Sequence, residues 1–152
     1  MNLKNNKPIQ MKLLFTSILL LFHFTFFAQS NQVIGDYKLV FGKENDHLFK
    51  YNLTLNPDGT FLFNYYSFIK QGIPPEVNKY GKGKWTEENN VVTFFSDKNL
   101  DLDDKYTIDF SKSKARFVRR SPRNKTDEII KTGLRFIESE IFWMKGINFF
   151  KI

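Results

Sequence analysis

The sequence contains no cysteine and only two histidines among its 152 residues. Without cysteine it can form no disulfide, no thiolate metal site and no thioether-linked lipid. A Ser-His-Asp site or a transition-metal site would depend on His47, because His23 lies in an N-terminal apolar run. A surface role for His47 is the simpler interpretation, so we expect no catalytic residue, no metal, no cofactor and no enzyme activity. The lack of disulfides, with the asparagine- and lysine-rich composition, favours a bacterial exported protein.

The N-terminal segment has the three parts of a secretory signal peptide. Three lysines precede an apolar run, residues 13–27, which ends at the small residue Ala28. The alternative is an uncleaved membrane anchor, but this run is about 15 residues long and a membrane-spanning helix needs roughly 20. We therefore expect residues 1–28 to be removed after Ala28. The mature domain, residues 29–152, would then be periplasmic or extracellular and have no stable membrane span.

Removal of this segment lowers the charge and leaves a domain rich in aromatic residues. The mature part keeps 20 basic and 16 acidic residues, a net charge of about +4 by the same counting. It also keeps 13 of the 18 phenylalanines, all six tyrosines and both tryptophans. Aromatic side chains in this number suit a sheet with a thick apolar face, and they can form a core without disulfides.

The clearest local signal is a β-hairpin in the first half of the mature chain. Residues 49–55 alternate apolar and polar side chains, as do residues 60–66, which is the pattern of strands with one buried face. Between them stands Asn-Pro-Asp-Gly at residues 56–59. Pro57 suits the second position of a type I turn, and Gly59 can adopt the left-handed conformation that closes the hairpin with a bulge.

The rest of the mature chain shows similar short strands and no convincing helical periodicity. Close spacing and short turns predict an antiparallel meander, all-β, that closes into a barrel of about 8–10 short strands. The expected strands, besides the hairpin, are 35–41, 81–86, 91–96, 106–110, 115–118, 134–137, 140–144 and 147–151.

Three short motifs follow one another in this meander: Gly35-x-Tyr37, Leu53-x-Leu55-x-Pro57-Asp58-Gly59-Thr60-Phe61 and Gly83-x-Trp85. This order resembles small exported lipocalin-like (calycin-type) β-barrel domains of bacteria. The resemblance covers residues 35–96, and it departs from true lipocalins at Tyr37, where tryptophan is usual. It implies an up-and-down barrel that can hold a small apolar ligand.

One face of the predicted strands supplies the candidate ligand-binding residues. An apolar ligand would be held by burial among aromatic side chains. The same residues are also the predicted core, and core packing is the alternative interpretation for them, including Trp143, and for Trp85. The candidates are Tyr37, Leu39, Phe49, Tyr51, Leu53, Phe61, Phe63 and Trp143.

A basic run at residues 112–125 suggests an alternative function as a non-enzymatic interaction module of the cell envelope. An acidic partner would meet this surface electrostatically. Nucleic acid is not expected as a partner, because Phe117 is the single aromatic residue inside the run and stacking on bases needs more. A solvated sheet edge is the simpler interpretation. The residues proposed for the partner are Arg116, Arg119, Arg120 and Arg123.

Two groups of acidic residues are weaker candidates for a functional site. The stretch 97–104 holds clustered carboxylates, but it lacks the glycine and the bidentate glutamate of a calcium-binding EF-hand loop. Glu138 and Glu140 are spaced for the same face of a strand, as a glycosidase pair would require, although nothing else of that chemistry is visible. Both groups are interpreted as solvated polar surface.

The signal-peptide prediction is tested by the N-terminus of the exported protein. Intact mass and N-terminal sequencing should show a chain that begins at Gln29. The variant Ala28→Trp should accumulate unprocessed, because the cleavage site needs a small residue. An exported wild-type chain that still begins at Met1 would contradict the prediction.

Overall fold

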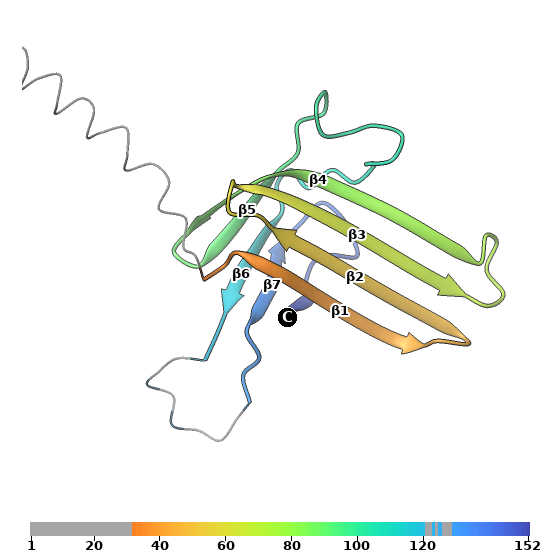
Figure 1. The fold of residues 1–152 in the computed structure, drawn as a ribbon, viewed down its shortest axis with the longest axis horizontal. Coiled ribbons are helices and arrows are strands. Elements are labelled where there is room, and N and C mark those ends of the chain that lie inside the picture. Colours follow the sequence, from red (N-terminus) through yellow and green to blue (C-terminus); the bar gives the residue numbers. More distant parts are fainter. Residues whose placement is uncertain (1–31, 121–122, 124, 126–128) are drawn as a thin grey trace, which may run out of the picture.

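The computed structural model describes residues 32–120, 123, 125 and 129–152, and these form an all-β fold. Eight strands pair in sequence order, each antiparallel to the next, and the last pairs with the first to close a barrel (Figure 1). The predicted antiparallel meander that closes into a barrel is thus confirmed, with a strand number inside the expected range. The predicted signal peptide, residues 1–28, lies outside the described residues. The strands are β1 (Gly35–Lys43), β2 (His47–Leu55), β3 (Thr60–Ile69), β4 (Glu76–Glu88), β5 (Val91–Phe95), β6 (Lys114–Val118), β7 (Gly133–Glu138) and β8 (Asn148–Lys151).

The turn between β2 and β3 has the geometry that its sequence predicts. The Gly59 N–H donates to the Asn56 carbonyl at 3.1 Å, and Gly59 has a φ of +82°, which costs glycine no Cβ clash. The Asp58 carboxylate accepts hydrogen bonds from the hydroxyl of Thr60 at 2.6 Å and from its backbone N–H at 2.9 Å. These two bonds lower the pKa of the Asp58 carboxyl, so the turn keeps its bonded form at neutral pH.

Trp85 of the neighbouring strand β4 is hydrogen-bonded to this turn. Its backbone N–H donates to the Gly59 carbonyl at 2.7 Å, and its indole Nε1–H donates to the Asn56 carbonyl at 3.1 Å. The ring is 1% exposed. The Asp58-Gly59 turn and the Gly83-x-Trp85 motif, which are far apart in the sequence, therefore meet in space and close this end of the barrel.

β4 is the corner of the barrel, because it changes partner along its length. It pairs with β3 as far as Lys84 and with β5 from Lys84 onward. A Cβ on Gly81 would lie 2.6 Å from the Phe110 ring. On Gly83, whose φ is +154°, it would lie 2.1 Å from the carbonyl oxygen of Phe95. The two missing side chains let a core ring and β5 approach β4 closely, as strand glycines do at a barrel corner.

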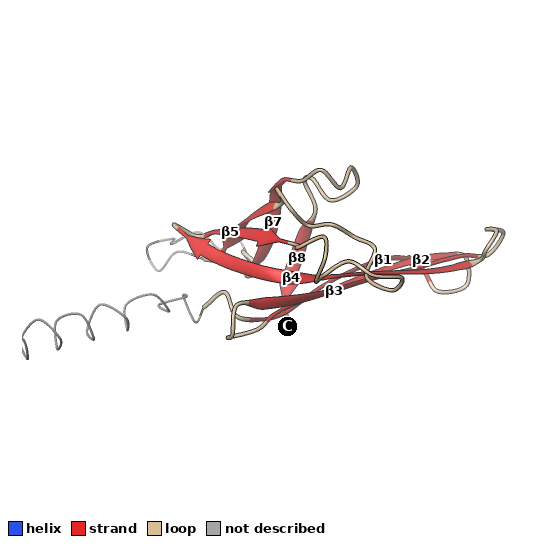
Figure 2. Ribbon diagram, turned by 90° about the horizontal axis from the view of Figure 1, so that it is seen from above, coloured by secondary structure: helices blue, strands red, loops and turns tan. Residues whose placement is uncertain are grey.

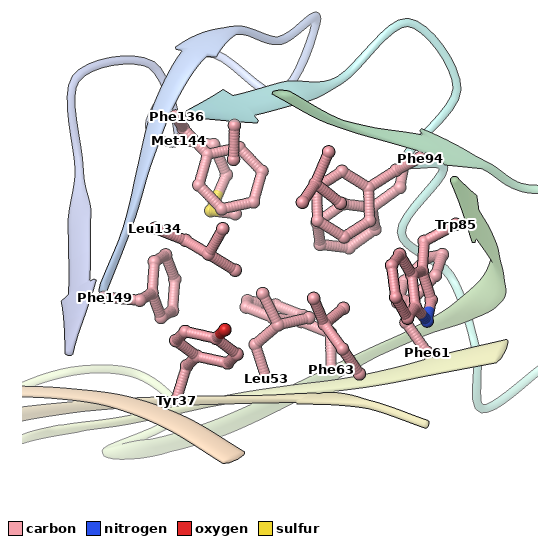
Figure 3. Packing of buried hydrophobic residues seen from close by; sticks show 14 of the residues in the cluster. Tyr37, Leu53, Phe61, Phe63, Trp85, Phe94, Leu134, Phe136, Met144 and Phe149 are labelled. Atoms are coloured by element: carbon pink, nitrogen blue, oxygen red, sulfur yellow. The ribbon is translucent and has the colours of Figure 1, made fainter. Parts of the chain in front are cut away.

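The core lies between the β1–β4 sheet and the shorter strands β5–β8. Side chains from the two halves point toward one another and fill the space between them (Figure 3). The residues that Figure 3 labels in this core are Tyr37, Leu53, Phe61, Phe63, Trp85, Phe94, Leu134, Phe136, Met144 and Phe149.

The β1–β4 sheet extends well beyond β5–β8, as Figures 1 and 2 show. β1 pairs with β8 only through Tyr37 and Lys38, so residues 39–43 continue past the barrel. β4 likewise pairs with β5 only from Lys84 onward. We call the ends of β1–β4 nearest the β1–β2 and β3–β4 turns the projecting sheet.

The predicted strand at residues 106–110 is wrong. The segment has the alternating burial of a strand, since Ile108 and Phe110 are buried, but it forms a single bridge, Tyr106 with Tyr80. Its amides bond elsewhere: the Ile108 N–H donates to the Tyr80 carbonyl, and the Phe110 N–H donates to the hydroxyl of Ser96. The position beside β5 belongs to β6, so no second partner strand is available to it.

The predicted strand at residues 140–144 is also wrong, and the segment is a loop. The Met144 N–H donates to the Ile141 carbonyl at 2.9 Å, and the Ile147 N–H donates to the Met144 carbonyl at 3.1 Å. Residues 141–144 are apolar without alternation, so they fit neither face of a sheet. Instead the loop inserts Met144, which is fully buried, into the core and places Trp143 beside it.

The corner of β4 predicts a large difference between two glycine substitutions. Gly83→Ala should lower the free energy of unfolding by about 3 kcal/mol, because the new Cβ overlaps β5 backbone and the φ is unfavourable. Gly146→Ala should cost about 1 kcal/mol, because its φ is +88° but nothing lies within 4 Å. Urea unfolding of both variants measures the difference, and equal losses would refute this account of the corner.

Candidate functional site

All eight predicted ligand-binding residues lie on the inner face of the barrel or against its core. Five are buried, and Tyr51 is the most exposed of them at 5%. Leu39, Phe49 and Trp143 are half-buried and pack against the cluster. The pairing register explains the arrangement: Leu53 stands opposite Phe63, and one step along the sheet Tyr51 stands opposite Tyr65. Alternation therefore puts the predicted residues on one face, in successive rows.

The deeper rows are occupied by packing contacts between aromatic rings. Phe61 lies 5.1 Å from Phe94 and 5.1 Å from Phe110, and Phe63 lies 4.9 Å from Phe110, measured between ring centroids. Phe136 from β7 lies 5.3 Å from Phe94. Edge-to-face and offset contacts at these distances are favourable packing arrangements. These rings therefore hold the two halves of the barrel together.

The outer rows form a continuous group of five rings that we call the aromatic mouth: Phe41, Phe49, Tyr51, Tyr65 and Trp143. Tyr51 is its centre, with ring centroids 5.0 Å from Tyr65, 5.7 Å from Trp143 and 5.8 Å from Phe41. Phe41 stacks on Phe49 at 4.9 Å, and Tyr65 lies 5.3 Å from Trp143. The rings come from β1, β2, β3 and the β7–β8 loop.

The four rings around Tyr51 are partly exposed, because the strands opposite are shorter than the projecting sheet. Phe41 is 46% exposed, and Phe49, Tyr65 and Trp143 are half-buried. Phe41 and Tyr65 were not among the predicted ligand-binding residues. The signal for both was present in the sequence, since Phe41 alternates with Tyr37 and Leu39, and Tyr65 follows Phe61 and Phe63 at the same spacing.

The mouth carries no charge at physiological pH. Burial, with a smaller contribution from neighbouring Tyr65, raises the pKa of the Tyr51 phenol to about 12. The nearest charge in the same row is Lys79, which stands opposite Tyr65 on β4 and is exposed. A neutral ring surface favours an apolar ligand over an ionic one.

The other candidate residues have structural partners. His47 is exposed at the start of β2, with its Nδ1 3.1 Å from the carboxylate of Asp46. Glu138 pairs with Lys114 at 2.9 Å, and Glu140 pairs with a different lysine, Lys112, at 2.6 Å. The two glutamates do not share a strand, because β7 ends at Glu138.

The acidic stretch 97–104 uses its carboxylates to hold turns. Asp97 accepts from the N–H of Asn99 at 2.8 Å, and Asp101 accepts from the N–H of Asp97 at 2.8 Å. Asp103 accepts from two backbone N–H groups and from the Lys82 ammonium, and these bonds lower the pKa of its carboxyl. Among the described residues, no group of three His, Cys, Asp or Glu side chains is placed to hold a metal ion.

The four arginines of the predicted basic surface are all exposed. Arg116 is exposed on β6, and Arg119, Arg120 and Arg123 are exposed in the segment that follows this strand. Phe117, between them in the sequence, points inward and is buried. Alternation therefore separates the aromatic residue of this run from its charges.

No protein-family model, no curated protein and no solved structure matches this chain. Its function is therefore inferred from the arrangement of its own side chains. In the part of the chain that the structure describes, no helix is long and apolar enough to cross a membrane.

Ionisation of Tyr51 predicts an alkaline loss of stability. In the unfolded chain a tyrosine loses its proton near pH 10, whereas the folded protein holds the Tyr51 proton to about pH 12. The unfolded state is therefore favoured progressively as pH rises from about 10 to about 12. Urea-unfolding midpoints should fall less steeply over this range in Tyr51→Phe than in the wild type, and identical slopes would contradict the assignment.

Proposed function

We propose that this protein is an exported lipocalin-like β-barrel that binds a small apolar ligand at its aromatic mouth. The observation that carries the proposal is the run of ring contacts that continues from the buried core to partly exposed Phe41. Eight-stranded barrels are either filled by side chains or hold one small ligand. Here rings fill the deeper rows, so the ligand would sit on the outer rows.

The shape of the mouth favours a small ligand with a flat apolar face. Phe41 and Phe49 are stacked with an interplanar angle of 23°, and Tyr65 and Trp143 are inclined by 31°. Exposed ring faces of this kind form offset stacks with other flat groups. A contiguous apolar surface that remains exposed in a folded domain is typical of a binding site.

The fully buried members of the predicted set support the mouth and would not touch the ligand. Leu53 and Phe63 lie one row deeper than Tyr51 and Tyr65 in the same register. Phe149 contacts both Tyr51 and Phe63, at 5.9 and 6.3 Å, so it joins the mouth to the core. A preorganised ring surface loses little side-chain entropy when a ligand binds.

Binding of the neutral fluorescent probe N-phenyl-1-naphthylamine tests the proposal. The purified protein should enhance probe fluorescence, and Trp143→Leu and Phe49→Leu should each weaken binding about 2- to 12-fold. This range follows from a loss of about 0.5–1.5 kcal/mol per aromatic contact.

Phe142 provides the matched control, because it neighbours Trp143 in the loop but is 90% exposed. Phe142→Leu should bind the probe as tightly as the wild type. Native mass spectrometry of gently purified protein adds a second readout, in which a retained small molecule is expected. The proposal fails if Trp143→Leu, Phe49→Leu and Phe142→Leu all bind the probe equally and mass spectrometry detects no retained small molecule.

A further inference from the structure

Two arginines stand directly opposite each other on the outer face of the barrel. The register of β6 and β7 pairs Arg116 with Arg135, and both side chains are exposed. Their neighbours Ala115 and Leu134 are buried, so both arginines point away from the core. Like charges directly opposite on neighbouring strands are destabilising. The pairing therefore costs stability unless something anionic lies between the two guanidinium groups.

Two surface cavities meet at this arginine pair. One, of about 210 Å³, is lined by Lys131, Arg135 and Asn148, together with Gly133 and apolar residues around it. The other, of about 290 Å³, is lined by Arg116, Arg135 and Lys145, among others. Arg135 borders both cavities. The ammonium of Lys131 also lies 5.4 Å from the Phe150 ring centroid, at the edge of the first.

Among the described residues, those that line the two cavities include no carboxylate. The ion pairs that the described residues form with one another include neither Arg116 nor Arg135. Arg116 stands opposite Val91 of β5, and Val91 stands opposite Glu88 of β4. Glu88 is therefore the carboxylate residue in the same cross-strand row as Arg116. Glu88 and Arg116 are not among the ion pairs that the described residues form with one another.

We propose that the groove around Arg116 and Arg135 is a binding site for a phosphate group. A phosphate that bridges the two guanidinium groups would replace their repulsion with two sets of charge-assisted hydrogen bonds. The planar fork of arginine matches phosphate oxygens, and Lys145 and Asn148 add donors on either side. A phosphomonoester carries about −1.5 to −2 charges and three acceptor oxygens, which suits several convergent cations better than a carboxylate does.

This site is separate from the aromatic mouth. Arg135 alternates with the inward-facing Leu134 and Phe136 on β7, so the groove and the mouth lie on opposite faces of the barrel wall. The proposed phosphate site also differs from the basic surface predicted from the sequence. The two share Arg116, but the other cations of the phosphate site come from β7 and from the loops around β8. Either binding site can therefore be lost without the other.

Titration calorimetry with inorganic phosphate, at constant ionic strength in chloride, tests the proposal. Arg135→Gln and Arg116→Gln should each weaken phosphate binding about 10-fold or more, since each loses hydrogen bonds to a charged group. Lys98→Gln is the control, because Lys98 is an exposed cation outside the lining of both cavities, and it should bind as the wild type does.

A stability measurement separates a binding role from a structural one. Without phosphate, Arg135→Gln should unfold at the same or a higher urea concentration than the wild type, because the like-charge pair is removed. With phosphate, the wild type should gain stability and the variant should not. Wild-type phosphate affinity in both Arg135→Gln and Arg116→Gln would overturn the proposal.

Vesicles of phosphatidylcholine with and without phosphatidic acid, whose headgroup is a phosphomonoester, distinguish the source of the phosphate. Binding to the anionic vesicles that depends on Arg135, and that inorganic phosphate competes away, assigns the site to a lipid headgroup. Binding of inorganic phosphate without vesicle binding assigns it to a free or soluble phosphate. Absence of both, in a protein that is folded by its urea-unfolding curve, would overturn the proposal.

Discussion

The barrel depends on the ability of β4 to leave β3 and join β5 within a few residues. Gly81 and Gly83 make this possible, because any Cβ there would overlap the Phe110 ring or the β5 backbone. The change of partner brings Trp85 onto the β2–β3 turn, where its two N–H groups satisfy turn carbonyls. Closure at this end also leaves the opposite ends of β1–β4 unmatched, because these strands have 9 to 13 residues and β5–β8 have 4 to 6. The projecting sheet is therefore a consequence of the strand lengths.

Strand alternation divides the molecule into two chemically different surfaces. Inward residues build a neutral aromatic core that becomes the mouth where the opposite strands end. Outward residues of β6 and β7 build a cationic row, in which Arg116 and Arg135 are brought together at a cost in electrostatic repulsion. The two surfaces differ in what they can bind. The mouth has little capacity to bind anions, and the cationic row has no exposed stacked rings between its arginines. The same backbone thus places the proposed apolar ligand site and the proposed phosphate site on separate surfaces.

Much of the fold was predictable because its signals are local. The alternation in residues 49–55 and 60–66 and the turn at Gly59 depend on neighbours in the sequence, and the structure has them as expected. The two segments that were wrongly predicted as strands contain apolar residues, but one lacks a partner strand and the other lacks alternation. Residues 106–110 alternate correctly, yet β6 occupies the place beside β5; residues 140–144 are apolar throughout and pack as a loop. Whether an extended segment becomes a strand depends on a partner that local sequence does not reveal.

The sequence by itself determined the turn chemistry, the face on which each strand residue lies and the scarcity of residues for nucleophilic or metal chemistry, because these follow from residue type and period-2 spacing. The tertiary structure alone decided how deep each inward residue lies. Tyr37 and Phe41 have the same alternation on β1, yet one is buried and the other is 46% exposed, because β8 covers only the first part of β1. It also decided that Arg116 faces Arg135, since register joins residues that are distant in the chain. Burial depth and cross-strand pairing depend on which segments meet, and only the closed barrel specifies that.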